Sequence, residues 1–79
     1  MLEEVDKDRF EEAVREYDEV TRSHPELANA HYNLAVTLER TGQTERARQE
    51  YQAYLQLSPD AADAAEVRNR LRKLGSSAH

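Results

Sequence analysis

The chain repeats part of its own pattern at an interval of 34 residues. Shifting the 79-residue sequence by that interval brings identical residues into register. The identical pairs are Glu11 and Glu45, Ala13 and Ala47, Glu16 and Glu50, Tyr17 and Tyr51, Pro25 and Pro59, Ala28 and Ala62, and Ala30 and Ala64. A frame that places both prolines and both tyrosines exceeds coincidence, so the chain is interpreted as a repeat protein whose units cover one another's apolar faces.

Apolar residues within each unit recur at steps of three and four, the spacing of one face of an α-helix. Three predicted helices carry such faces: Phe10, Ala13, Val14, Tyr17 and Val20; Leu27, His31, Leu34 and Leu38; and Ala47, Tyr51, Tyr54 and Leu55. A fourth predicted helix has Asp60 and Asp63 in its first turn and basic residues in its last, which complements the helix dipole. The predicted fold class is therefore all-α, built from antiparallel helix–turn–helix repeats.

The helix ends are predicted from local signals. Ser23 and Glu26, three residues apart, predict a capping box at the start of the second helix, and Thr44 is expected to cap the third. Gly42 and Gly75 are expected to end the second and fourth helices, because a residue without Cβ can adopt the left-handed conformation that closes a helix.

Residues 28–59 resemble a complete tetratricopeptide repeat, the 34-residue helix–turn–helix unit. Seven residues stand at signature positions of that family: Leu34, Ala35, Leu38, Gly42, Ala47, Tyr51 and Pro59. His31 replaces the usual tryptophan, where it is expected to be packed and hydrogen-bonded, and Tyr54 replaces a usual alanine. The resemblance, which spans residues 8 to 64, implies a short right-handed α-superhelix with a concave binding groove.

The expected organisation is a single domain over residues 1–74, followed by a flexible tail at 75–79. Within the domain, residues 1–25 form an incomplete first repeat, 26–59 a complete repeat, and 60–74 a C-terminal capping helix. Two alternatives remain open for the leading segment. It forms a separate short helix, or it continues into the next as one helix from near Leu2 to Arg22.

The resemblance implies that the helix from Ala28 to Arg40 lines the groove. Candidate residues for contact with a peptide or partner are Asn29, Tyr32, Asn33, Val36 and Arg40, joined by Glu66, Arg70 and Lys73 from the last helix. Asn33 stands where family members often hydrogen-bond the backbone of an extended peptide, and it is equally interpreted as a polar residue on a solvated face. The basic residues of the last helix are interpreted as stabilising a helix end rather than as a carboxylate clamp.

Charge and composition exclude several function classes. A formal net charge of -5 disfavours nucleic acid and anionic membrane surfaces and favours a basic partner. The chain has no cysteine and no apolar run long enough to span a bilayer, so a cytoplasmic location is expected. It has no glycine-rich phosphate loop and no HExxH pattern, and we expect no cofactor, no metal site and no catalysis.

Two functions remain. The first is a non-catalytic protein-interaction module that binds a peptide or partner helix in the groove. The alternative is a self-assembly element, a homodimer formed through the incomplete first repeat. Its expected dimer face consists of Phe10, Ala13, Val14 and Tyr17.

Overall fold

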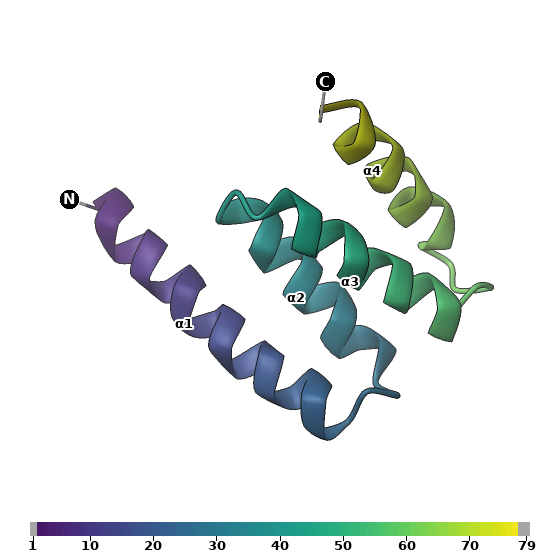
Figure 1. Cartoon of the computed structure of the whole chain (residues 1–79), viewed down its shortest axis with the longest axis horizontal. Helices are drawn as coiled ribbons and strands as arrows, with labels where there is room; N and C mark the ends of the chain where they lie inside the picture. The colour runs from purple at the N-terminus through teal and green to yellow at the C-terminus, as the bar shows by residue number, and fades with distance from the viewer. Residues whose placement is uncertain (1, 78–79) are drawn as a thin grey trace.

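The computed structural model describes residues 2–77, with side chains described for residues 9–75. Four helices follow one another along the chain: α1 (Leu2–Ser23), α2 (Ala28–Arg40), α3 (Thr44–Leu57) and α4 (Ala64–Ser77). Among residues 2–77 there is no strand, which confirms the predicted all-α helical repeat. Figure 1 shows α1 and α4 as the outer helices, with α2 and α3 between them.

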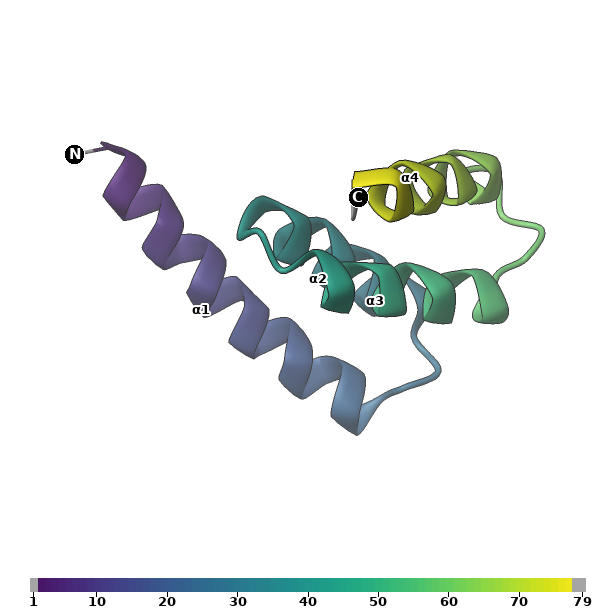
Figure 2. The same ribbon diagram turned by 45° about the horizontal axis from the view of Figure 1, so that its top comes forward.

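The leading segment continues into the next helix. Helix α1 runs without interruption from Leu2 to Ser23, 22 residues, which decides between the two alternatives for this segment. At 1.5 Å per residue it is about 33 Å long. Its N-terminal half projects away from the other three helices (Figure 2).

The core lies where α2 and α3 pack together. Ala35 on α2 and Ala47 on α3 are completely buried, as expected for small residues that let two helix axes approach closely. Every helix contributes to the buried apolar cluster, which consists of Val14, Leu34, Ala35, Leu38, Ala47, Tyr51, Tyr54 and Val67. Ala13, expected to play the same role on α1, is only half-buried.

Both predicted side-chain caps are wrong. Ser23 is the last residue of α1, and Leu27 occupies the N-cap position of α2. The intervening turn is made by the backbone, with the Leu27 N–H donating to the His24 carbonyl at 3.1 Å, so the predicted capping box does not form. Thr44 lies inside α3, and Gln43 takes the N-cap position.

Helix α4 begins and ends later than predicted. It starts at Ala64, so Asp60 and Asp63 precede it, and the Val67 N–H donates to the Asp63 carbonyl at 3.0 Å. It continues through Gly75 to Ser77, so the predicted end at Gly75 is wrong and the basic residues lie in mid-helix. Of the predicted tail, residues 75–77 are helical, and residues 78–79 lie outside the described residues.

Gly42 ends α2 as predicted. Its φ of 81° is in the left-handed region, and no other described residue has a positive φ. The Gly42 N–H donates to the Glu39 carbonyl at 3.1 Å, and the Gln43 N–H donates to the Leu38 carbonyl at 2.9 Å. These two bonds form a Schellman motif, which satisfies carbonyls that the helix end would otherwise leave unpaired.

The two glycines should therefore respond oppositely to the same substitution. A Cβ at either position meets nothing within 4 Å, so only backbone conformation decides the outcome. We expect Gly42→Ala to lower the free energy of unfolding by about 1 kcal/mol, because alanine is strained at positive φ. Gly75→Ala should raise it by roughly 0.5 kcal/mol, because alanine favours a helix. Urea denaturation followed by circular dichroism measures both, and changes of the same sign would contradict this account.

Candidate functional site

A groove lies between α2 and α4, made of two adjoining hollows. The larger, about 450 Å³, is lined by Glu39, Glu66, Asn69, Arg70 and Lys73. The smaller, about 270 Å³, is lined by Val36, Glu39, Arg40 and Arg70. Because Glu39 and Arg70 border both hollows, they form one continuous polar surface, which we call the α2/α4 groove.

An ion pair between the two helices borders both hollows of the α2/α4 groove. Nη1 of Arg70 lies 3.1 Å from Oε1 of Glu39, and its Nη2 lies 3.8 Å from Oε2 of Glu66. The Tyr51 hydroxyl donates to the same Glu39 oxygen at 2.7 Å. Burial of Tyr51 and the bond to the Glu39 carboxylate both raise the pKa of this phenol. The phenol therefore stays protonated and donates this hydrogen bond at any physiological pH.

Three tyrosines pack together edge to face or at a tilt, and one of them, Tyr51, contacts the groove residue Glu39. The Tyr32 ring lies 6.0 Å from that of Tyr51 in a T-shaped arrangement and 5.4 Å from that of Tyr54, between centroids. The Tyr54 hydroxyl donates to Oδ1 of Asp63. That bond, with burial, raises the pKa of Tyr54 to about 12. The carboxylate of Asp63 is therefore bound by a residue of α3, and Asp63 immediately precedes Ala64, the first residue of α4.

The residues predicted to contact a ligand divide into two groups. Five of them line the α2/α4 groove: Val36, Arg40, Glu66, Arg70 and Lys73. The other three are Asn29, Tyr32 and Asn33, and none of them borders either hollow. Asn29 and Asn33 are exposed on α2, whereas Tyr32 is half-buried among the tyrosines.

Two groove residues, Glu39 and Asn69, are missing from the sequence prediction. Asn69 lies three residues after Glu66 and four before Lys73, so the helical spacing used for its neighbours could have found it. Glu39 likewise follows Val36 by three residues. Its role is less visible from sequence, because it depends on a partner in α4 that is 31 positions away.

Three residues of the predicted dimer face of α1, namely Phe10, Val14 and Tyr17, pack towards α2, whereas Ala13 is half-buried. Val14 is 7% exposed within the core cluster, and Tyr17 packs against that cluster. Phe10 lies beneath the guanidinium of Arg40, whose Cζ is 5.7 Å from the ring centroid. Pairing of two copies through this face would therefore require α1 to leave its own α2, that is, an exchange of helices.

Over residues 2–77, no helix is long and apolar enough to cross a membrane. In the same residues, no three histidine, cysteine, aspartate or glutamate side chains are grouped so that they could hold a metal ion.

Helices that pack in sequence order, with a groove across their exposed polar faces, define a helical repeat protein of the kind that binds other proteins. The family described as tetratricopeptide repeat matches residues 2–62, more than half of the chain. The chain belongs to the tetratricopeptide repeat family, whose members generally act as non-catalytic protein-interaction modules. It has no significant match among curated proteins or among solved structures.

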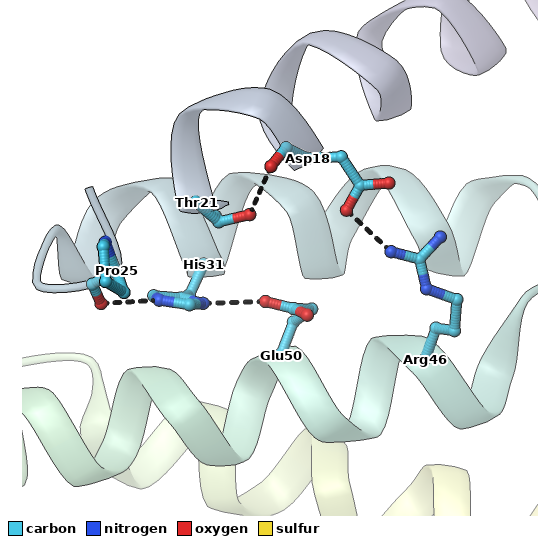
Figure 3. A network of polar contacts seen from close by, with 6 residues as sticks. All are labelled: Asp18, Thr21, Pro25, His31, Arg46 and Glu50. Carbon is cyan, nitrogen blue, oxygen red and sulfur yellow. Dashed lines mark hydrogen bonds and ion pairs between the residues drawn. The ribbon is translucent and has the colours of Figure 1, made fainter. Parts of the chain in front are cut away.

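A second polar cluster joins α1, α2 and α3 (Figure 3). Nδ1 of His31 lies 2.7 Å from Oε1 of Glu50, and its Nε2 lies 2.9 Å from the Pro25 carbonyl. On the neighbouring turns, Nη2 of Arg46 donates to Oδ1 of Asp18 at 2.8 Å. His31, which replaces the family's usual tryptophan, thus holds the α1–α2 turn against α3 by hydrogen bonds, as its expected packed position suggested.

Both acceptors favour the protonated ring of His31. Burial alone lowers the pKa of His31, but the hydrogen bonds to Glu50 and the Pro25 carbonyl outweigh it and raise the pKa above 6.5. The physical reason is that only the imidazolium can donate from both nitrogens at once. Neutral His31 would leave one nitrogen lone pair facing an oxygen.

We therefore expect the protein to be more stable in mildly acidic than in mildly basic solution. Because the pKa of His31 is higher in the folded chain than in the unfolded one, its stabilisation is complete below 6.5 and is lost as pH rises through the folded value. The thermal unfolding midpoint of the wild type should decrease as the pH is raised from about 6 to about 8. His31→Gln should reduce that fall, and His24→Gln, at an exposed position, should preserve it. A midpoint that does not change over this range rejects the assignment.

Proposed function

We propose that the chain binds an extended peptide or a partner helix in the α2/α4 groove and catalyses no reaction. The observation that carries the proposal is the pair of adjoining hollows, because they are lined by residues from two consecutive repeat units. Family membership supports the same conclusion, since tetratricopeptide repeats generally bind proteins.

The charges of the groove favour recognition by hydrogen bonds. Its three cations, Arg40, Arg70 and Lys73, face two carboxylates, Glu39 and Glu66, so the groove is nearly neutral. Arg70 already contacts both carboxylates, and it would have to give up those contacts to bind an acidic ligand. We therefore propose that neither a carboxylate clamp nor a strongly basic partner governs binding here.

Exposed amide side chains could recognise a ligand by hydrogen bonds instead of by charge. Asn29 and Asn33 lie one turn apart on α2, and Asn69 lies in the larger hollow on α4. An amide side chain offers both a donor and an acceptor, as does each peptide unit of an extended ligand. Binding through Asn33 and Asn69 would orient the ligand across α2 and α4, while Val36 offers an apolar contact between them.

We also propose the unit boundaries that this site implies. The complete repeat extends over residues 26–59, preceded by an incomplete repeat over 1–25 and followed by the capping segment that begins at residue 60. The groove then lies at the junction between the complete repeat and the cap. The continuation of α4 to Ser77 supports a cap somewhat longer than the sequence suggested.

Peptides selected from a random display library against the wild-type chain test this proposal. The double variant N33A/N69A should bind the selected peptides about thirtyfold more weakly, because two hydrogen bonds contribute roughly 1 kcal/mol each. Isothermal titration calorimetry measures the affinity.

The matched control is Q52A/Q56A, which removes two exposed amides from α3 instead. Amide shifts in nuclear magnetic resonance spectra should map the peptide onto α2 and α4. Equal affinity for the two double variants, shifts confined to α1 or α3, or a selection that yields no binding peptide would each count against the groove.

A further inference from the structure

The two outer helices carry opposite charges. Helix α1 contains nine acidic and four basic residues, a net charge of −5, and α4 contains one acidic and four basic residues, a net charge of +3. Helices α2 and α3 each contain equal numbers of both kinds and are neutral. Helices α1 and α4 lie at opposite sides of the array and do not contact one another in the described chain, so their opposite net charges do not neutralise each other within one molecule (Figure 1).

One face of α1 is open although its counterpart in the next unit is covered. The internal repeat pairs Ala13 with Ala47 and Val20 with Tyr54. Ala47 and Tyr54 are 0% and 4% exposed, whereas Val20 is 37% exposed and Ala13 is half-buried. The positions that neighbouring helices cover on α3 are thus accessible on α1.

The comparison of α1 with α3 also indicates which side chains a helix docked on the open face of α1 should provide. Glu16 of α1 is the repeat counterpart of Glu50, and Glu50 pairs with His31 from the neighbouring helix. A cationic side chain opposite Glu16 would reproduce that contact. The exposed side of α1 also carries a hollow of about 460 Å³, which is lined by Glu12, Arg15, Glu16, Asp18, Glu19 and Arg22.

Helix α4 presents such cations on an exposed face. Arg68 and Arg72 are four residues apart, so they lie on one side of the helix, and neither lines the α2/α4 groove. Nη2 of Arg68 donates to the Pro59 carbonyl across an exposed contact of 3.3 Å. Its position one residue after buried Val67 places it beside an apolar flank that includes half-buried Leu71.

We propose that copies of this chain associate head to tail, with α4 of one copy docked on the open face of α1 of the next. Arg68 and Arg72 then face Glu12 and Glu16, and Val20 is covered. The contact joins two different surfaces, so each docked copy leaves another α1 and another α4 available, and association continues beyond two copies. This association differs from pairing through Val14 and Tyr17, and it does not depend on the groove.

The association is weak and sensitive to salt. Helix α4 has 14 residues and is about 21 Å long, so one helix-to-helix contact falls below the roughly 1,200 Å² that specific stable interfaces bury. Attraction between exposed charges is screened by added salt. Copies should therefore assemble at high protein concentration and low ionic strength.

Sedimentation velocity of the wild-type chain provides the first measurement. At low salt, the weight-average mass should rise with concentration past twice the chain mass of 9.1 kDa. It should return towards a single chain in about 0.5 M sodium chloride, where screening acts within roughly 4 Å. A mass of one chain at every concentration, or one that stops at two chains regardless of salt, overturns the proposal.

Charge reversal tests the two surfaces directly. The variants R68E/R72E and E12R/E16R should each remain monomeric, because in each case like charges face one another. Mixed together they should assemble again into alternating chains, since the reversed α4 of one fits the reversed α1 of the other, and the unchanged ends still match. Recovery on mixing excludes misfolding as the cause of either loss.

The control variant E26R/E45R makes the same change in net charge as E12R/E16R at exposed positions outside α1 and α4, and it should assemble like the wild type or more strongly. Circular dichroism should give the same helical content for all variants. If the mixture stays monomeric while the wild type assembles, the copies associate through other surfaces and the assignment of α4 and α1 is wrong.

Discussion

The close packing of α2 against α3 is the contact on which the rest of the structure depends. It is possible because alanines, Ala35 and Ala47, are completely buried at this interface. A larger side chain at either position would push the axes apart and open space around the fully buried Leu34, Leu38 and Tyr51. Helices α1 and α4 attach to this pair from opposite sides, each through fewer buried residues, so their positions depend on its geometry.

Tyr51 links the core to the α2/α4 groove. Its ring is completely buried, yet its hydroxyl reaches Glu39, which in turn accepts from Arg70 of α4. The carboxylate is thus held by one donor from α3 and one from α4. Side chains fixed in this way lose little conformational freedom when a ligand arrives, so the groove is organised before it binds.

The repeat frame was predictable from the sequence because it depends on local spacing. Four helices, the seam of Leu34 and Leu38, the left-handed turn at Gly42 and most of the groove residues all follow from periods of 3.6 and 34. The helix starts were not predictable in the same way. Ser23 could not cap α2 because it is the last residue of α1, and the turn that follows is made by backbone hydrogen bonds.

Helix α4 shows more clearly which features local sequence signals could not predict. Ala64 is buried in register with Ala30, but buried Val67 comes one position before Arg68, where the family frame places a core leucine. Tyr54 stands where a small residue is usual. The large ring is buried in the core, and its hydroxyl donates a hydrogen bond to the carboxylate of Asp63 just before the helix. Neither adjustment has a local signature, because both arise from packing between α3 and α4. Glu39 escaped prediction for the same reason, since its function is defined by Tyr51 and Arg70.

Net charge is a poor guide to this molecule because the fold separates its charges. The value of -5 suggests a basic partner, yet the helices that form the α2/α4 groove are neutral and positive. The negative charge lies on α1 and in the turns. Helix α4 takes part in two surfaces with different physics: Arg70 and Lys73 face the groove, and Arg68 and Arg72 lie outside it. Since the four cations divide between those surfaces, a change at Arg72 leaves every groove-lining side chain in place, so the proposed groove binding and the proposed association of copies can be tested separately.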